Sequence, residues 1–291
     1  MSDIYKPNGC SVLSDIPADP QIRVGFQGPP GVGKTTAALT FPNPIVLNID
    51  RGLGAHGHRS DVIEVPFWNP KFVDSIVPRS GANCPPNRRD ALLKWLKTEG
   101  MKLSPTQTLI LDSNTQIQNA YHAEYNVNPV IAKSGKVDDF AEWKYKLTFY
   151  DELMMWLKTI PCNVVYICHE TPDRDKTGEL NGMVRPLLTG QFADQLASHM
   201  TDWFRCLAFA KPTSDKLPKF KELFKLTDQQ VTEWLKTGAD QTVYVWQTQC
   251  DERAMSVKTS TLFNAPKYIL ADYSSLNKYK RKVNDTNKPN S

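Results

Sequence analysis

The sequence predicts an α/β fold in which a mainly parallel central sheet is covered by helices on both faces. Short apolar runs typical of strands alternate with runs of helical periodicity between residues 21 and 170, and this alternation is typical of parallel sheets. A charged helical insert at about 211–240 and late strand-like runs follow, which we expect to add antiparallel strands. With 291 residues, of which 40% are hydrophobic, the chain can bury one large core.

The expected elements follow from local patterns of apolar residues. A strand over 21–27 precedes a helix that begins near Thr36. The other expected strands lie at 44–50, 108–113, 163–168, 242–248 and 255–259, and the other expected helices at 91–97, 115–124, 140–158 and 227–236.

These elements predict one domain over residues 21–276. Residues 1–20 contain several prolines and predict an extended leader before the first strand. Residues 277–291 are rich in lysine and arginine and predict a basic, disordered tail. The sequence contains no internal repeat.

A glycine-rich segment joins the first strand to the first helix. Residues 28–35 read GPPGVGKT and fit the pattern G-x-x-x-x-G-K-[ST]. In this pattern the glycines let backbone N–H groups close around phosphates, the lysine reaches the β- and γ-phosphate oxygens, and the threonine hydroxyl binds magnesium. A turn that binds nothing is the alternative, but the flanking strand and helix favour a phosphate-binding loop. The expected nucleotide-binding residues are Gly28, Pro29, Pro30, Gly31, Val32, Gly33, Lys34, Thr35 and Thr36.

An acidic residue at the end of a later strand extends this predicted site. Asp112 ends an apolar run, and P-loop proteins place the carboxylate that holds the magnesium shell at such a strand end. We therefore expect Thr35 and Asp112 to hold Mg²⁺. The Asn-Lys-x-Asp pattern that reads guanine is absent from the sequence, which favours ATP over GTP. The sequence thus predicts ATP and Mg²⁺ as cofactors.

Five segments together resemble the RecA-like ATPases that phages encode and that act in single-strand annealing and recombination. These segments are 28–36, 109–113, 164–170, 185–190 and 256–259. The resemblance implies a RecA-like P-loop core and an ATPase that acts on single-stranded DNA in phage recombination or replication. It also implies a homo-oligomer with ATP at the subunit interfaces, located in the bacterial host cytoplasm. A single-strand-binding or replication protein is a candidate partner.

The resemblance also assigns roles to individual residues. His169 stands where RecA-like proteins carry a polar sensor of the γ-phosphate, and a structural histidine fits this strand end equally well. Lys258 stands where family members carry basic residues that reach the neighbouring subunit's ATP. The usual Lys-x-Arg pair is only half present there, and a surface lysine is the alternative. The segments that match the DNA-binding loops contain charges suited to phosphate contact or to a solvated loop, namely Lys133, Lys136, Arg174, Lys176 and Arg185.

One position departs from the family. RecA-like enzymes carry a water-polarising glutamate shortly after the second strand, and Gly52 stands at that position. Asp50 is a candidate substitute, and it joins Lys34, Asp112, His169 and Lys258 as an expected catalytic residue. The alternative is a nucleotide-switched DNA- or protein-binding module with little hydrolysis. A phosphoryl-transferring kinase is a third interpretation, for which the sequence shows no recognisable acceptor pocket or arginine-rich lid.

The composition argues against several other classes of protein. The first residues lack an apolar signal core, the six cysteines form no C-x-x-C pair, and the most apolar runs are too short to span a membrane. These features predict a cytoplasmic protein without a membrane partner. The net charge of +4 is too small to indicate nucleic acid by itself. His56 and His58 lack neighbouring carboxylates or cysteines that could complete a metal site. We therefore interpret both histidines as loop residues.

Overall fold

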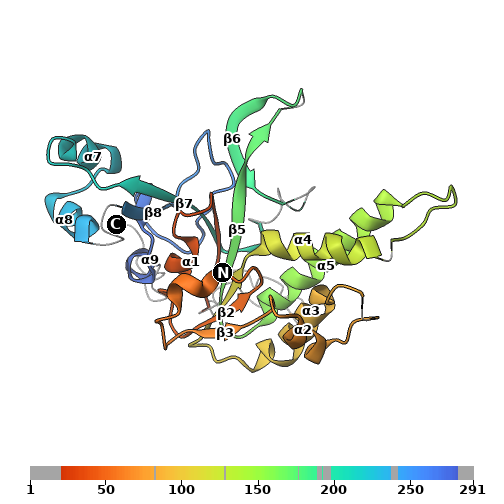
Figure 1. The fold of residues 1–291 in the computed structure, drawn as a ribbon. Helices are drawn as coiled ribbons and strands as arrows, with labels where there is room; N and C mark the ends of the chain where they lie inside the picture. Colours follow the sequence, from red (N-terminus) through yellow and green to blue (C-terminus); the bar gives the residue numbers. More distant parts are fainter. Residues whose placement is uncertain are drawn as a thin grey trace, which may run out of the picture.

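The centre of the molecule is a nine-stranded sheet in the order β3-β2-β4-β5-β1-β7-β8-β9, with β6 paired to β5 outside this path (Figure 1). The computed structural model describes residues 21–81, 83–127, 129–175, 177–188, 192, 198–236 and 242–280. The predicted leader at 1–20 and residues 281–291 of the predicted tail lie outside the described residues.

The strands from β3 to β7 in this order form a parallel sheet. β1 lies between β5 and β7 and is parallel to both, and β4, β2 and β3 continue the parallel sheet beyond β5. The parallel strands are β1 (Arg23–Gly28), β2 (Pro44–Asn48), β3 (Ile63–Val65), β4 (Thr108–Asp112), β5 (Asn163–Arg174) and β7 (Asp202–Ala210). Segments that follow the ends of these strands therefore start from one edge of the sheet.

The later strands run in the opposite direction. β8 (Thr242–Gln247) pairs antiparallel with β7, and β9 (Tyr268–Leu270) pairs antiparallel with β8. The expectation of a mainly parallel sheet with late antiparallel strands is confirmed. The run at 255–259 was expected to form a strand, and this is wrong: its described pairing is a single bridge between Lys258 and Trp203.

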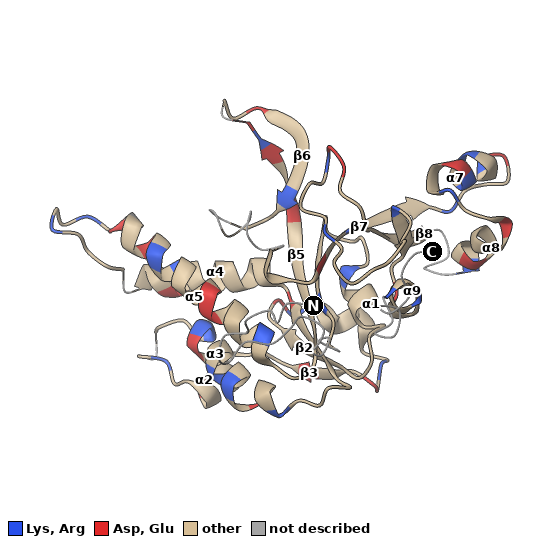
Figure 2. Cartoon of the chain, turned by 180° about the vertical axis from the view of Figure 1, so that it is seen from behind, with Lys and Arg blue, Asp and Glu red and all other residues tan. Residues whose placement is uncertain are grey.

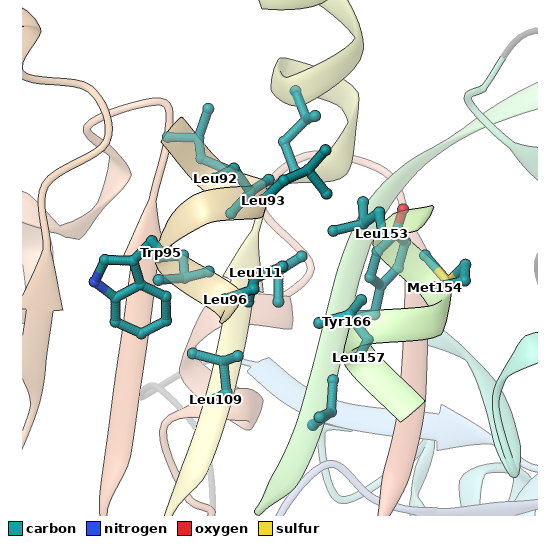
Figure 3. Packing of buried hydrophobic residues seen from close by; sticks show 14 of the residues in the cluster. Leu92, Leu93, Trp95, Leu96, Leu109, Leu111, Leu153, Met154, Leu157 and Tyr166 are labelled. Atoms are coloured by element: carbon teal, nitrogen blue, oxygen red, sulfur yellow. The ribbon is translucent and has the colours of Figure 1, made fainter. Parts of the chain in front are cut away.

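Helices cover both faces of the sheet, as the sequence predicted. Successive strand residues point to opposite faces, so Leu109 and Leu111 pack in one apolar cluster whereas Ile110 packs in the other. Figure 3 shows the first cluster, in which leucines of α3 and α5 lie over β4 and β5. The helices on this face are α2 (Pro70–Ile76), α3 (Arg88–Thr98), α4 (Asn114–Val127) and α5 (Asp139–Thr159), and those on the other are α1 (Lys34–Ala38) and α9 (Tyr273–Tyr279).

Two hairpins project from the body of the molecule (Figure 1). The first is formed by β5 and β6 (Leu180–Pro186), which pair antiparallel. We expected the strand that begins at Asn163 to end at Cys168, but β5 continues to Arg174. The second hairpin is formed by α4 and α5, which extend together away from the sheet.

The charged insert folds into two helices, α7 (Leu217–Phe224) and α8 (Asp228–Lys236). Only α8 was predicted. Both helices contribute to a third apolar cluster with β8 and β9. The predicted start of the tail at residue 277 is also wrong, because α9 continues to Tyr279 and its Leu276 is buried. Two short 3-10 helices, Gly52–His56 and Gly100–Lys102, complete the described elements.

Candidate functional site

The glycine-rich segment forms a loop at the carboxyl end of β1. β1 ends at Gly28 and α1 begins at Lys34. Gly31 and Gly33 have φ values of 79° and 76°, a left-handed conformation that glycine adopts without steric penalty. A Cβ atom at Gly33 would also lie 2.8 Å from Cδ1 of Tyr244. The backbone of this loop therefore favours glycine at both positions, of which Gly33 belongs to the sequence pattern.

Lys34 turns its amine back onto the loop. Its Nζ donates hydrogen bonds to the carbonyl oxygens of Gly28 and Pro29, at 2.9 and 2.7 Å. The residue is only 6% exposed, and this burial lowers the pKa of the amine. The amine is thus held by backbone carbonyls at the place where the loop would receive phosphate.

The loop is joined directly to the acid of the neighbouring strand. Thr35 donates a hydrogen bond from Oγ1 to Oδ2 of Asp112, at 2.7 Å. Asp112 is 6% exposed, and burial raises its pKa to about 6 against the opposing effect of the Thr35 hydrogen bond. A hydroxyl and a carboxylate are oxygen ligands of the kind that Mg²⁺ prefers. The pair predicted from sequence is therefore in contact and fits a magnesium ion.

His169 lies beside the start of the loop. It is in register with Gly28 across the β1–β5 pair, and its backbone N–H donates to Oγ1 of Thr115 at 3.2 Å. Its Nδ1 is buried and has no hydrogen-bond partner in the part of the chain that the structure describes. Burial lowers the pKa of this imidazole, and the nearby Lys34 amine lowers it further. A buried nitrogen without a partner, next to a phosphate-binding loop, fits a residue that forms its hydrogen bond with a bound ligand.

Asp50 lies in the same group of charges. It follows Ile49, whose backbone N–H donates to the carbonyl oxygen of Asp112 at 2.9 Å, and its carboxylate raises the pKa values of both Asp112 and His169. Its Oδ1 accepts a hydrogen bond from the backbone N–H of Gly52 at 2.9 Å. The structure therefore brings Lys34, Thr35, Asp50, Asp112 and His169 together at the carboxyl edge of the sheet.

Sequence reasoning missed a buried ion pair at the same edge. Arg205 donates from Nε and Nη2 to the two carboxylate oxygens of Glu170, at 2.9 and 2.8 Å. The two side chains are 8% and 7% exposed. Because β1 lies between β5 and β7, this pair bridges the strands on either side of the loop's own strand. Glu170 could have been singled out from the sequence because it follows His169 at a strand end. Arg205 could not, because it belongs to β7, a strand that the sequence patterns did not indicate.

Lys258 lies away from the loop of its own subunit, and its expected role at the ATP of a neighbouring subunit stays a prediction. Its Nζ donates to the carbonyl oxygen of Met200 at 3.0 Å, and its backbone pairs with Trp203. Met200 precedes β7 and Trp203 is its second residue, so both lie at the end of β7 that corresponds to the amino end of β1. The structure therefore does not bring Lys258 to the loop of its own subunit, because the loop follows the opposite end of β1.

Four of the five residues expected to contact DNA lie on the two hairpins that project from the body of the molecule (Figure 2). Lys133 and Lys136 are exposed in the turn between α4 and α5. On the other hairpin, Arg174 donates to the carbonyl oxygen of Gly178 at 2.6 Å, and Arg185 pairs with Asp173 at 3.3 Å. Lys176 lies outside the described residues. The set is thus divided between two separate protrusions.

A cavity of about 140 Å³ adjoins the loop next to α1. Gly33 and Thr36 form the side nearest the loop, and Tyr244 and Asp272 line it farther along. The cavity is the size of a nucleobase in order of magnitude and has an aromatic wall, as base-binding sites often do. Among the described residues, no group of three or more histidine, cysteine, aspartate or glutamate side chains could form another metal site.

A protein-family model described as "AAA domain" matches residues 21–265. The search of solved structures found the assembled ATPase EscN from the type III secretion system of enteropathogenic E. coli, at 11% sequence identity and a TM-score of 0.36. That match covers 69% of this chain and 45% of EscN. The complex of EscN with its central stalk EscO matches at 11% identity and a TM-score of 0.33, covering 64% of this chain and 42% of that chain. This chain therefore corresponds to less than half of either EscN chain.

No curated protein sequence matches this chain. None of the helices in the described residues has the length and hydropathy needed to cross a bilayer. The family match spans most of the chain and includes both the glycine-rich loop and Asp112. The chain therefore belongs to the AAA domain family of P-loop ATPases.

Proposed function

We propose that this chain binds ATP with Mg²⁺ at the glycine-rich loop and hydrolyses the ATP. The observation that carries this proposal is the direct hydrogen bond between Thr35 and Asp112, because it joins the loop to the expected magnesium-binding acid. Bound ATP supplies the phosphoryl group that is transferred to water. Lys34 would offset the phosphate charge, while Thr35 and Asp112 would hold the metal ion.

Asp50 is the proposed proton acceptor for the attacking water. Its Oδ1 accepts from the Gly52 N–H, which orients the carboxylate and leaves Oδ2 to take a proton. The exposure of Asp50 allows water to reach it. The small residue at position 52 supports this role, because a Cβ there would lie 2.9 Å from Oδ1 of Asp50 and disturb its position.

Adenine is the proposed base. The cavity beside Gly33 and Thr36 continues from the loop, so a nucleotide whose phosphates occupy the loop could place its base there. The ring of Tyr244 offers an aromatic surface for stacking. The absence of the guanine-reading sequence pattern supports the same choice.

Single-stranded DNA is the proposed polymer on which the ATPase acts, in phage recombination or replication. The support comes from the resemblance to RecA-like ATPases and from the exposed Lys133 and Lys136 on a projecting hairpin. Lysine side chains of this kind displace counterions from phosphates. Assembly into a homo-oligomer, and recruitment by a single-strand-binding or replication protein, belong to the same proposal.

A nucleotide-switched module with little hydrolysis is the second candidate, and it is favoured if Asp50 does not replace the glutamate that RecA-like enzymes carry where this chain has Gly52. Phosphate release by the purified chain, measured with and without single-stranded DNA, separates the two candidates. The ATPase proposal predicts release that depends on Mg²⁺ and rises with DNA. Tight ATP binding without phosphate release under either condition would support the switch and overturn the enzyme.

A further inference from the structure

The α4–α5 hairpin carries a concentration of exposed apolar side chains. Fifteen large apolar side chains are exposed in the described residues, and seven of them lie between Val127 and Tyr145. Soluble proteins commonly expose such side chains singly, whereas a cluster marks a binding surface. The hairpin also projects from the body of the molecule, where a partner can reach it (Figures 1 and 2).

Two aromatic residues dominate this surface. Phe140 is 72% exposed and Trp143 is 37% exposed. They lie three residues apart on α5 and therefore share a face of the helix. Their ring centroids are 6.3 Å apart and the ring planes differ by 30°. Leu147, four residues farther along that face, packs against the core. Neither ring belongs to an apolar cluster of the described core, so core packing does not account for them.

Three lysines lie near the aromatic pair in the sequence, on the same hairpin. Lys133 and Lys136 lie in the turn that the Ile131–Val137 bridge closes, and Lys144 follows Trp143 directly. All three are exposed. None forms an ion pair with another side chain that the structure describes.

Two nearby carboxylates, by contrast, have partners within the protein. Glu142 lies 2.7 Å from Nδ1 of His122 and 3.7 Å from the Lys146 amine. Asp138 accepts a hydrogen bond from the backbone N–H of Ala141 at the start of α5. The three exposed lysines therefore remain available for contact with phosphate.

We propose that the hairpin is a base-stacking platform for single-stranded nucleic acid, in which Phe140 and Trp143 stack on bases while Lys133, Lys136 and Lys144 contact phosphates. Flat rings next to unpaired lysines match the alternation of bases and phosphates along a strand. A protein partner fits less well, because lysine is depleted at protein–protein interfaces. A duplex fits less well too, since its bases already stack inside the helix. The proposal rests on the proposed action on DNA and names the surface that contacts it.

The test measures the affinity of the full-length protein for a labelled oligothymidylate over a range of salt concentrations. The Phe140→Ala/Trp143→Ala variant is compared with Met155→Ala, a control that removes a side chain 51% exposed on the same helix. We expect the double variant to bind about 5- to 150-fold more weakly for each base that no longer stacks. Its slope of log affinity against log salt should stay unchanged, because no charge is removed. Trp143→Phe should retain most of the affinity, since it retains an aromatic face.

A second variant, Lys133→Ala/Lys136→Ala, should instead change the slope of log affinity against log salt, because it removes two positive charges. Its slope should fall by about 0.7 for each phosphate of the single strand that the protein no longer neutralises. An unchanged affinity of Phe140→Ala/Trp143→Ala, with the parent still binding, would overturn the platform and leave the proposed DNA function standing. Absence of binding by the parent would overturn both. Loss of self-association without loss of DNA binding would show that the surface joins copies of this chain, which also overturns the proposal.

Discussion

At the scale of single residues, Asp112 combines burial with a negative charge that no described lysine or arginine contacts directly. Its pKa is raised from 3.8 to about 6, chiefly by burial. A bound cation would oppose that shift, because it favours the charged form of the carboxylate. The buried carboxylate therefore lowers the stability of the nucleotide-free protein at neutral pH and favours metal binding.

This electrostatic state predicts the effect of Asp112→Asn. The unfolded carboxyl group ionises near pH 3.8 and the folded one near pH 6, so the parent loses stability as the pH rises through this window. The variant carries a neutral asparagine, so it does not lose stability over this pH range. At pH 7 to 8 the variant should be more stable by up to about 3 kcal/mol, since one pKa unit corresponds to about 1.4 kcal/mol. Near pH 4 the difference should vanish. Urea unfolding of the two proteins at several pH values measures it.

The same variant should lose the effect of Mg²⁺ on ATP binding and on phosphate release. A variant that is stabilised at neutral pH but still responds to Mg²⁺ like the parent would show that Asp112 is a buried acid with no role at the metal.

Asp50 provides a separate prediction for the chemical step. Asp50→Asn should leave ATP affinity nearly unchanged and lower the rate of phosphate release by about 10²- to 10⁴-fold, the usual effect of losing a general base. Asp61→Asn is the matched control, because it neutralises an exposed aspartate that pairs with Arg59 in the same part of the chain. Single-turnover phosphate release measures the step. Equal rates for the parent and Asp50→Asn would exclude Asp50 as the base.

At the scale of elements, the Glu170–Arg205 pair connects the root of the β5–β6 hairpin to β7 across β1. Two parallel hydrogen bonds fix the pair in both distance and direction. Because the pair lies beside His169 and at the end of the strand that carries the loop, it positions the hairpin relative to the nucleotide site.

Removing one partner of this pair should be strongly destabilising. Glu170→Gln and Arg205→Gln should each lower the free energy of unfolding by about 3–5 kcal/mol, because each leaves a buried charge without its partner. The double variant should lose less free energy of unfolding than the sum of the two single losses. Lys97→Ala is the control, since its pair with Glu152 is exposed and contributes at most about 1 kcal/mol. Additive losses in urea unfolding would show that the two side chains act independently.

The elements also show what could be predicted from the sequence. The loop at 28–35 and Asp112 were found because their signals are local: each is a short pattern attached to a strong apolar strand. The full length of β5 was missed because Pro172 argues against a strand. The proline is tolerated because this part of β5 lies beyond the central sheet and pairs with β6.

Other features were missed because they depend on contacts between distant segments. Arg205 meets Glu170 only because β1 lies between their strands, and no local sequence pattern indicates this arrangement. The aromatic pair of the α4–α5 hairpin was missed for a similar reason. Phe140 and Trp143 have the spacing of a core-facing helix, and only the structure shows that this end of α5 projects beyond the core.

At the scale of the whole molecule, α4 links the nucleotide site to the proposed platform. It begins two residues after Asp112, and its Thr115 hydroxyl accepts the backbone hydrogen bond of His169. With 14 residues, the helix is about 21 Å long. Asp112, the proposed magnesium-binding acid, and the exposed hairpin therefore lie at opposite ends of one element.

The position of Lys258 bears on assembly. Its amine donates to the Met200 carbonyl oxygen near the amino end of β7, so reaching the ATP of a neighbouring subunit would require this hydrogen bond to break. Arg174 and Arg185 are engaged within the β5–β6 hairpin in this structure.

The central claim is that ATP binds at the loop through Lys34. Calorimetric titration of ATP with Mg²⁺ into the parent and Lys34→Ala tests it most directly. The variant should fold normally, because removing a buried amine whose pKa is lowered by burial relieves an unfavourable charge. We predict that the parent binds and that Lys34→Ala binds about 10- to 150-fold more weakly, as expected for the loss of a charged hydrogen bond of about 1.5–3 kcal/mol. Equal affinity in the two proteins would contradict the account, because the nucleotide would then bind somewhere other than this loop.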